Sequence, residues 1–395
     1  MLHSALASGF RRSVVSLAAL CAAVVAVLVA AGAVTAPQSF TDMPASASSI
    51  APNTGTTTGG SQITITGAYL ALTTGVTVGG APCSNVTVVN ATTVTAVTPA
   101  GTLGNADVVI TGGKGTITMP GGYRYVSIVV PSWATLVEAQ PDPAVVTDPE
   151  LRAAIAATGL AWRVRDTGTQ MEMMLIPPGT FQMGCIMGSN QHECSLKEQP
   201  FHQVTLTNAF YMGRYEVTQS QWVAKMGKNP SLYVAVNGYP GSDARPVERV
   251  SWTTIQDYLG ATGMRLPTEA EWEYACRAGT KTPFYNGSTD DNMVGALAWY
   301  VPNSRGQTHA VGGKAANGFG LHDMLGNVSE WVNDWFGAYP SSDQTNPTGP
   351  AKGLSRVFRG GSWYPQPEDP RSSSRDFVAP GITMASVGFR VARTP

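Results

Sequence analysis

The chain has 395 residues, which is enough for two or more domains with separate cores. Its formal net charge is -1, which excludes the strongly basic surface typical of proteins that bind nucleic acid or anionic membranes. Only 13% of the residues are charged, whereas 43 glycines and 27 prolines favour β structure and ordered loops over helical bundles. We therefore expect a β-rich or α+β protein.

The N-terminal segment, residues 1–36, is predicted to direct export. Arg11 and Arg12 precede an apolar run over residues 14–36, and the small residues 31–33 suit signal-peptide cleavage. The run is longer than a typical signal core, so a cleaved signal peptide and a membrane anchor are both open. Either one places the rest of the chain in the periplasm, at the cell surface or in the medium. Residues 37–49 are small and polar, as in a linker.

Residues 50–126 contain short β-branched runs that are separated by glycine pairs, the pattern of a small antiparallel β-sandwich. The segment begins with I-x-P-x-x-G at Ile50 and continues with G-G-x-x-I-T-I-T-G and V-G-G-x-x-C up to Cys83. It ends with G-Y-R-Y at residues 122–125 and resembles the IPT/TIG family of immunoglobulin-like domains. The resemblance implies a spacer or adhesion unit without chemistry of its own.

Residues 127–170 are predicted to connect this sandwich to a second domain, residues 171–395. One short helix is expected in the connector, because Asp148 can cap it, Pro149 suits its first position, and residues 151–157 are apolar and alanine-rich. In the second domain, Thr218 and Thr268 are each followed three residues later by Gln or Glu, the pattern of a reciprocal helix cap. The second of these helices should bury Trp272 in the core.

Five cysteines are present, and an exported chain can keep disulfides. Cys185 and Cys194 are close enough in sequence to close a small loop, so we predict a disulfide, with free buried thiols as the alternative. Cys83 and Cys276 are predicted to be isolated core thiols in different domains.

A series of motifs over residues 171–393 is similar to the formylglycine-generating enzyme family, also called sulfatase-modifying factors. The motifs follow the family order: I-P-x-G-x-F-x-M-G (176–184), E-x-P-x-H-x-V (198–204), Y-E-V-T (215–218), R-P-V-x-x-V-S-W (245–252), R-L-P-T-E-A-E-W-E-Y-A (265–275), G-L-x-D-M-x-G-N-V-x-E-W (320–331), R-G-G-S-W (359–363) and G-F-R-V (388–391). The resemblance implies an α+β fold related to C-type lectins, with two small sheets and little regular structure.

Active members of that family oxidise a sulfatase cysteine to formylglycine with a copper ion held by two cysteines. The matching positions fall near Pro365 and Pro370, and no cysteine follows Cys276. Copper in such a site needs soft thiolate ligands, and proline has no side-chain donor. We therefore expect neither copper nor sulfatase-activating chemistry, with Ser362 as the only remnant of the catalytic neighbourhood.

A second branch of the family uses non-haem iron bound by a histidine-rich region. Nothing of that kind precedes Met171, and five scattered histidines do not supply two histidines and a carboxylate. His192, Glu193 and Cys194 with His202 form the one tight cluster of potential ligands. A disulfide beside a structural His202 is favoured over a transition-metal site there.

The resemblance also implies a structural calcium site. Asp323 and Glu330 match positions that provide side-chain oxygens, and Gly326 and Val328 match positions that provide backbone carbonyls. Two carboxylates with carbonyls between them suit this hard cation. The alternative is that both acids only accept hydrogen bonds from backbone amides in a turn. The arginines of the motifs, Arg265, Arg359 and Arg390, are expected to be structural.

The interval 364–387 has varied side chains between two family motifs. Related proteins that are diversified by retroelements carry their ligand-contacting residues in this interval, and a lectin-like fold would bring them to one exposed face. An ordinary divergent loop surface is the alternative. The candidate ligand-binding residues are Tyr364, Gln366, Asp369, Asp376, Phe377, Ile382 and Met384.

The first functional hypothesis is an exported, non-catalytic binding or display protein, whose C-terminal face recognises an unknown protein or glycan. The second is an oxidase or related enzyme of the same family that uses an unrecognised site. The missing cysteines favour the first hypothesis.

Overall fold

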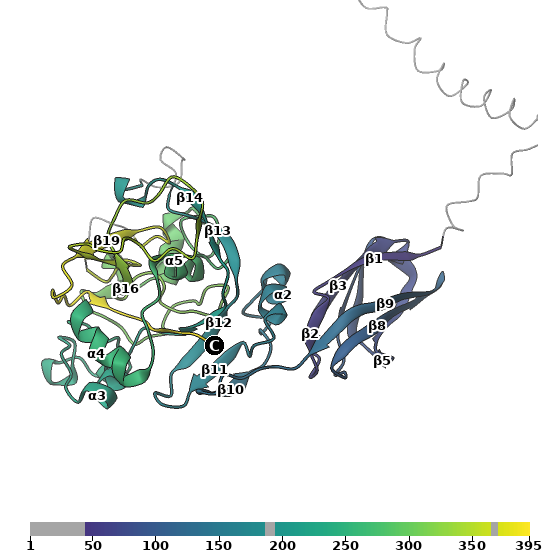
Figure 1. Cartoon of the computed structure of the whole chain (residues 1–395), viewed down its shortest axis with the longest axis horizontal. Coiled ribbons are helices and arrows are strands. Elements are labelled where there is room, and N and C mark those ends of the chain that lie inside the picture. The colour runs from purple at the N-terminus through teal and green to yellow at the C-terminus, as the bar shows by residue number, and fades with distance from the viewer. Residues whose placement is uncertain (1–43, 186–193, 365–369) are drawn as a thin grey trace, which may run out of the picture.

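The computed structural model describes residues 44–185, 194–364 and 370–395. Nine strands form a β-sandwich of two sheets (Figure 1). One sheet has the order β1-β3-β7-β6 and the other β2-β9-β8-β4-β5. The strands are β1(Ser46–Ala51), β2(Thr54–Thr56), β3(Gln62–Ala68), β4(Thr73–Val78), β5(Ala81–Pro82), β6(Ser84–Asn90), β7(Thr93–Val97), β8(Gly104–Gly112) and β9(Gly115–Val126).

Side chains at alternate positions of the strands point inward and form the core of this sandwich. Ile63 and Ile65 are fully buried on β3, and Val94 opposes Ile65 on β7 and is also buried. The pairs are antiparallel as predicted, except that β2 pairs in parallel with the end of β9. The first strand begins at Ser46, within the segment predicted as a linker.

The predicted connector is part of the second domain. The strands β10(Ala134–Glu138) and β11(Arg163–Asp166) lie in one sheet with β12(Glu172–Ile176), β15(Phe210–Gly213) and β21(Ala392–Arg393), in the order β10-β11-β12-β15-β21. The predicted helix is α2(Pro149–Ala157), and the Asp148 side chain caps it by accepting a hydrogen bond from Glu150 N at 2.8 Å. The ordered sheet thus begins well before Met171.

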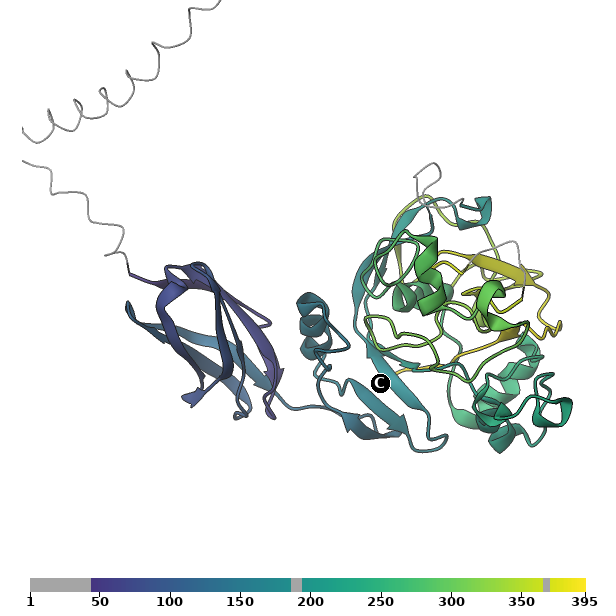
Figure 2. The same cartoon turned by 180° about the vertical axis from the view of Figure 1, so that it is seen from behind.

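Two smaller sheets complete this domain (Figure 2). One has the order β13-β14-β17, with β13(Gly179–Met183), β14(His202–Leu206) and β17(Gln344–Thr345). The other has the order β19-β18-β16-β20, with β16(Ser329–Trp335), β18(Arg356–Arg359), β19(Arg375–Val378) and β20(Val387–Gly388). Loops and short helices make up most of the rest, as the frequent glycines and prolines predict.

Three helices carry the caps that the sequence indicates. α3(Gln219–Met226) and α5(Glu269–Arg277) have the predicted capping boxes at Thr218 and Thr268, and α4(Trp252–Thr262) has a third box at Ser251. α5 ends at Arg277, and the left-handed residues Ala278 and Gly279 follow it. Two single-turn helices, α6(Val294–Leu297) and α7(Val301–Ser304), lie in the following loops.

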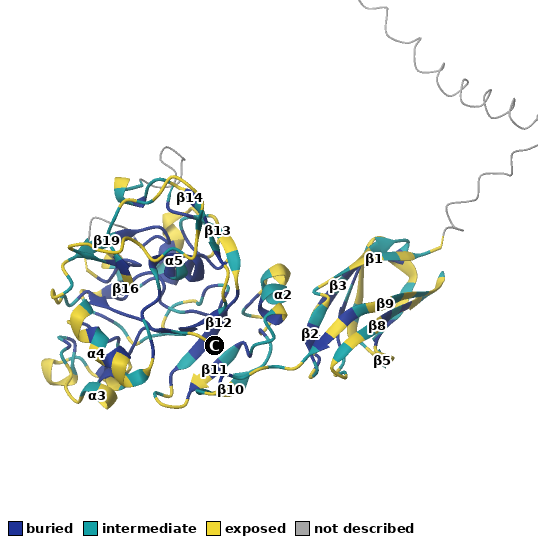
Figure 3. Ribbon diagram, viewed as in Figure 1, coloured by how far each residue is buried: buried dark blue, intermediate teal, exposed yellow. Residues whose placement is uncertain are grey.

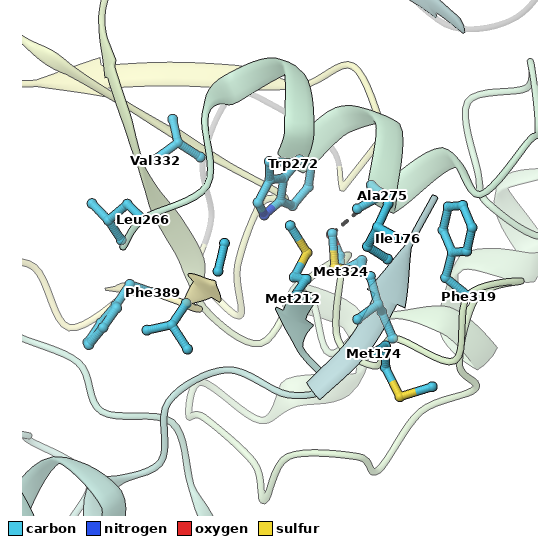
Figure 4. Packing of buried hydrophobic residues seen from close by; sticks show 14 of the residues in the cluster. Met174, Ile176, Met212, Leu266, Trp272, Ala275, Phe319, Met324, Val332 and Phe389 are labelled. Atoms are coloured by element: carbon cyan, nitrogen blue, oxygen red, sulfur yellow. Dashed lines mark hydrogen bonds between the residues drawn. The ribbon is translucent and has the colours of Figure 1, made fainter. Parts of the chain in front are cut away.

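The core of the second domain surrounds α5, which is buried along nearly its whole length (Figure 3). Trp272 has no exposed surface, as predicted, and it points among Met212, Met324 and Leu266 (Figure 4). Large side chains from β12, β15 and the loop before β16 fill the same interior.

Charged side chains also enter this interior, and those of α5 have partners there. Glu273 of α5 forms ion pairs with Arg277 at 2.7 Å and with Arg359 of β18. Glu269, one turn earlier, pairs with Arg375 of β19 at 2.7 Å. Each of these side chains is less than a tenth exposed. A charge at that depth is tolerated only when it is paired, so these contacts fix two strands to one helix.

No helix in the described ranges combines the length and the apolar character that crossing a bilayer requires. The predicted leader or anchor, residues 1–36, lies outside those ranges.

We expect Glu273→Ala to lower the free energy of unfolding of the second domain by about 3–5 kcal/mol, because it removes a carboxylate partner from two buried guanidinium groups. Urea unfolding followed by near-ultraviolet circular dichroism measures this loss. Arg165→Ala is the matched control, since it removes a surface ion pair whose arginine side chain is 45% exposed, and it should cost less than about 1 kcal/mol. Equal losses in the two variants would contradict the structural role of the buried pairs.

Candidate functional site

The family's copper position lies at the loop between β18 and β19. Ser362 follows two glycines in the left-handed region, Gly360 and Gly361, and it is 5% exposed. Its hydroxyl accepts a hydrogen bond from Tyr364 N at 3.2 Å. A Cβ on Gly361 would lie 3.1 Å from the Cα of Pro370, so the two ends of the loop lie together. Pro365, Gln366 and Asp369 lie outside the described residues.

The described cysteines offer no reactive thiolate to this loop. Cys276 is fully buried in α5, and burial raises the pKa of its thiol to about 12. Cys83 belongs to the sandwich, where burial raises its thiol pKa to about 11. Cys185 and Cys194 form the predicted disulfide. His192 and Glu193 lie outside the described residues, while His202 is buried and its Nδ1 lies 2.9 Å from the carbonyl of Pro200.

The predicted ligand-binding residues differ in their solvent exposure and in their contacts within the chain. Tyr364 is 52% exposed and Ile382 45% exposed. Asp376 instead pairs with Lys197 at 2.9 Å, and Phe377 stacks on Phe336 with 3.7 Å between ring centroids. The Lys197 ammonium also lies over the Phe377 ring, 5.5 Å from its centroid, so both side chains of β19 are engaged within the chain. The described interval is therefore not a single free face.

Met384 is partly buried and packs against the main core. Tyr364 belongs to an aromatic group that the sequence did not reveal. Its ring meets Trp363 edge-on at 5.3 Å, and Trp363 meets Tyr233 in the same way at 5.2 Å. Tyr239 extends the group with a contact to Tyr233 at 4.9 Å. Aromatic side chains of this kind dominate binding energy where they reach a surface.

The predicted calcium ligands do not act as one set. Both carboxylate oxygens of Glu330 bind Arg390, from Nη2 at 2.7 Å and from Nε at 2.7 Å, and one of them also accepts the Trp272 Nε1–H at 2.6 Å. Asp323 accepts a hydrogen bond from Gly312 N at 2.6 Å, while its Oδ1 is buried without a hydrogen-bond partner. Glu330 therefore fits an ion pair with a buried arginine and not a place in a calcium shell.

A third acid beside this loop, Glu216, was not predicted as a site residue. It accepts hydrogen bonds from Val328 N at 3.0 Å and from the Asn327 side chain at 2.7 Å. Burial raises the pKa of Glu216 well above its usual range, and the charges of Asp323 and Glu330 raise it further. Among the described residues, no group of three His, Cys, Asp or Glu side chains is arranged to hold a metal ion. Glu216 stands in the Y-E-V-T motif, which was the one signal for it.

The three motif arginines are structural, as predicted. Arg390 pairs with Glu330, Arg359 with Glu273, and Arg265 binds both oxygens of Glu271 at 2.6 and 2.7 Å.

Residues 158–395 match the family model described as "Sulfatase-modifying factor enzyme 1-like domain", and residues 45–125 match that of the IPT/TIG domain. The chain is 30% identical over 271 residues to "Chaperone protein LppX" of Paenibacillus barcinonensis, across 54% of this chain and 86% of that one. It is 35% identical over 162 residues to the formylglycine-generating enzyme of Mus musculus, across 37% of this chain and 44% of that enzyme. The chain thus spans less than half of the enzyme's length.

Two solved structures show a related fold. "Treponema denticola variable protein 1" is 30% identical, with a TM-score of 0.51 over 57% of this chain and 95% of that chain. PvdO from Pseudomonas aeruginosa is 28% identical, with a TM-score of 0.51 over 59% of this chain and 98% of that chain. The predicted fold, that of formylglycine-generating enzymes, is confirmed.

With Glu330 bound to Arg390, we expect calcium to contribute nothing to folding, so a chelator should leave the melting temperature of the purified chain unchanged. Thermal melting with added calcium, and then with excess chelator, measures this. A fall of several degrees on chelation, absent in Asp323→Ala, would instead support the predicted calcium site.

Proposed function

Because the chain belongs to the sulfatase-modifying factor enzyme 1-like family yet carries proline near both copper-binding positions, we propose that it is an exported, non-catalytic binding or display protein. The absence of any cysteine after Cys276 carries this proposal. Thiolate is both ligand and nucleophile in the family's oxidation chemistry, and proline can be neither.

The remaining groups near the loop support the same reading. The Ser362 hydroxyl already accepts a hydrogen bond from Tyr364 N, and the Cys276 thiol is fully buried with a pKa of about 12. Neither one is therefore an activated nucleophile. The Cys185–Cys194 disulfide suits a chain that leaves the cytoplasm.

We place the recognition surface at the exposed part of the interval 364–387. Among the described residues there, Tyr364 and Ile382 are the exposed large hydrophobic side chains, and Trp363 contacts the Tyr364 ring edge-on. An exposed aromatic ring that is packed against a second ring suits contact with a protein or a glycan. The structural likeness to a protein whose name calls it variable supports recognition as the task of this fold.

We expect no conversion when the purified chain is incubated with copper and a peptide containing Cys-x-Pro-x-Arg. Mass spectrometry should show the peptide thiol unchanged, because no cysteine follows Cys276 to bind copper at the family's position. A formylglycine-generating enzyme treated in parallel is the positive control. Formylglycine in the peptide would support the second hypothesis, an oxidase of the same family.

For the binding surface, we expect Tyr364→Ala combined with Ile382→Ser to lower binding at least about tenfold on arrays of glycans and extracellular proteins. Leu354→Ser is the control, because Leu354 is 92% exposed and lies outside the interval. Equal signals from the parent chain and the double variant would place recognition elsewhere.

A further inference from the structure

A cavity of about 300 Å³ opens beside the N-terminus of α5. The end of β16 and the loop that follows it form most of its wall, and β14 and β19 close the rest. Its ionisable lining includes His202, Glu269, Asp334 and Arg375, Gln344 and Thr348 add neutral polar groups, and Trp335 and Tyr339 are its aromatic residues. This volume is at the lower end of the usual range for small-molecule sites.

Two of the charged groups that line the cavity satisfy each other. Arg375 donates from Nη2 to Glu269 Oε2 at 2.7 Å and from Nη1 to the carbonyls of Lys197 and Gly337. Glu269 also accepts the Tyr339 hydroxyl proton at 2.9 Å. Neither the guanidinium nor this carboxylate is left to bind a ligand of opposite charge.

Asp334 is the exception. It is 3% exposed, and its Oδ2 accepts a hydrogen bond from Glu269 N at 2.9 Å. Among the described residues, no Lys, Arg or His forms an ion pair with it, and Oδ2 alone accepts a hydrogen bond. The buried carboxylate that lines the cavity is thus short of a partner.

The space beside this carboxylate depends on a glycine. Gly349 has φ +70°, and a Cβ there would lie 3.0 Å from Asp334 Oδ1 and 2.9 Å from its Cβ. Any other residue would be strained in this backbone conformation and would press on the carboxylate.

The geometry points to a binding site for a small organic cation, an alkylammonium or guanidinium head on a short apolar stem, with the head paired to Asp334. Arg356 already lies over the Trp335 ring at 3.6 Å, and Arg375 lies over the Tyr339 ring at 4.1 Å. These rings and the prolines of the lining therefore offer apolar surface to the stem, while Asp334 pairs with the head. Among the described residues of the interval 364–387, only Arg375 lines this cavity, and it is buried and not one of the predicted ligand-binding residues, so the inference does not rest on the proposed function.

The protonation state of Asp334 should make the affinity of the site for a cation depend on pH. Burial, and then the charge of Glu269, raise the pKa of Asp334 to about 8. The other groups that act on its charge are Glu271 of α5, Arg375 of β19 and Arg356 of β18, and His202 and Tyr339 line the cavity beside it. A cation binds the ionised form, so binding releases a proton at neutral pH. Affinity should therefore rise about tenfold per pH unit up to pH 8 and then level off.

The same shift predicts a stability effect in the free protein. The folded-state pKa of Asp334 lies above the ordinary value, so the protonated carboxyl contributes to the free energy of unfolding. This contribution is fully present below the ordinary pKa and is lost as the pH rises through about 8. A bound cation reverses this loss by favouring the ionised carboxylate.

The test is calorimetric titration of the full chain with n-butylamine, agmatine and n-butanol at pH 6, 7 and 8. We expect both amines to bind, with Kd about tenfold lower at pH 7 than at pH 6 and with proton release, whereas the neutral alcohol should not bind. A short blocked peptide with one lysine forms a further arm. Binding of that peptide assigns the site to protein side chains, and binding of the free amines alone assigns it to small molecules.

Asp334→Asn should weaken amine binding at least about tenfold and abolish its pH dependence, while the amide oxygen can still accept the hydrogen bond from Glu269 N. Asp343→Asn is the matched control, because Asp343 is exposed and does not line the cavity. Equal Kd values for the unaltered chain at pH 6 and pH 8, equal binding of butanol, or no binding of either amine would each overturn the proposal, whether or not the variant folds.

Discussion

The second domain depends on the carboxylates of α5 and the arginines that reach them from distant strands. Glu269 and Glu273 stand one turn apart on a helix that is almost wholly buried, and Arg375 and Arg359 arrive from neighbouring strands of one sheet. Regular structure is sparse, so hydrogen-bonded ladders alone cannot define the positions of the long loops. A buried ion pair has few geometries that satisfy both groups, which gives these loops a fixed place.

The same principle explains the loop before β16. Glu330 has both oxygens on Arg390, whose guanidinium also donates to the carbonyls of Gly213 and His322. The cation that lies among these backbone carbonyls and the carboxylate is thus the Arg390 guanidinium. Asp323 and Glu216 lie close to this pair, and burial, together with the negative charge of Glu330, raises the pKa of both acids.

Local features of the second domain could be predicted from the sequence, and distant pairings could not. The capping boxes at Thr218 and Thr268 depend on residues three positions apart, so the pattern and the structure agree. Arg359 and Glu273 lie 86 positions apart, and no spacing rule joins them. The order of the motifs predicted the fold, but the motifs do not predict which carboxylate forms an ion pair with which arginine.

The candidate sites show the same limit. Asp323 and Glu330 are seven positions apart, but one has a left-handed backbone and turns toward Gly312, whereas the other lies on a strand and turns toward Arg390. The whole interval 364–387 was predicted to be exposed. In the structure, however, Phe377 of β19 stacks on Phe336 and Asp376 pairs with Lys197. Asp334 was not predicted as a site residue, because its lack of an ion-pair partner depends on the residues that surround it in the folded chain.

These contacts also explain why the scaffold tolerates proline at the positions of the copper ligands. Arginine and carboxylate side chains hold α5, β16, β18 and β19 to one another. The loop between β18 and β19 is anchored at both ends, by the contact of Gly361 with Pro370 and by the bidentate pair of Arg371 with Glu198. Its middle can therefore change in sequence without loosening the core.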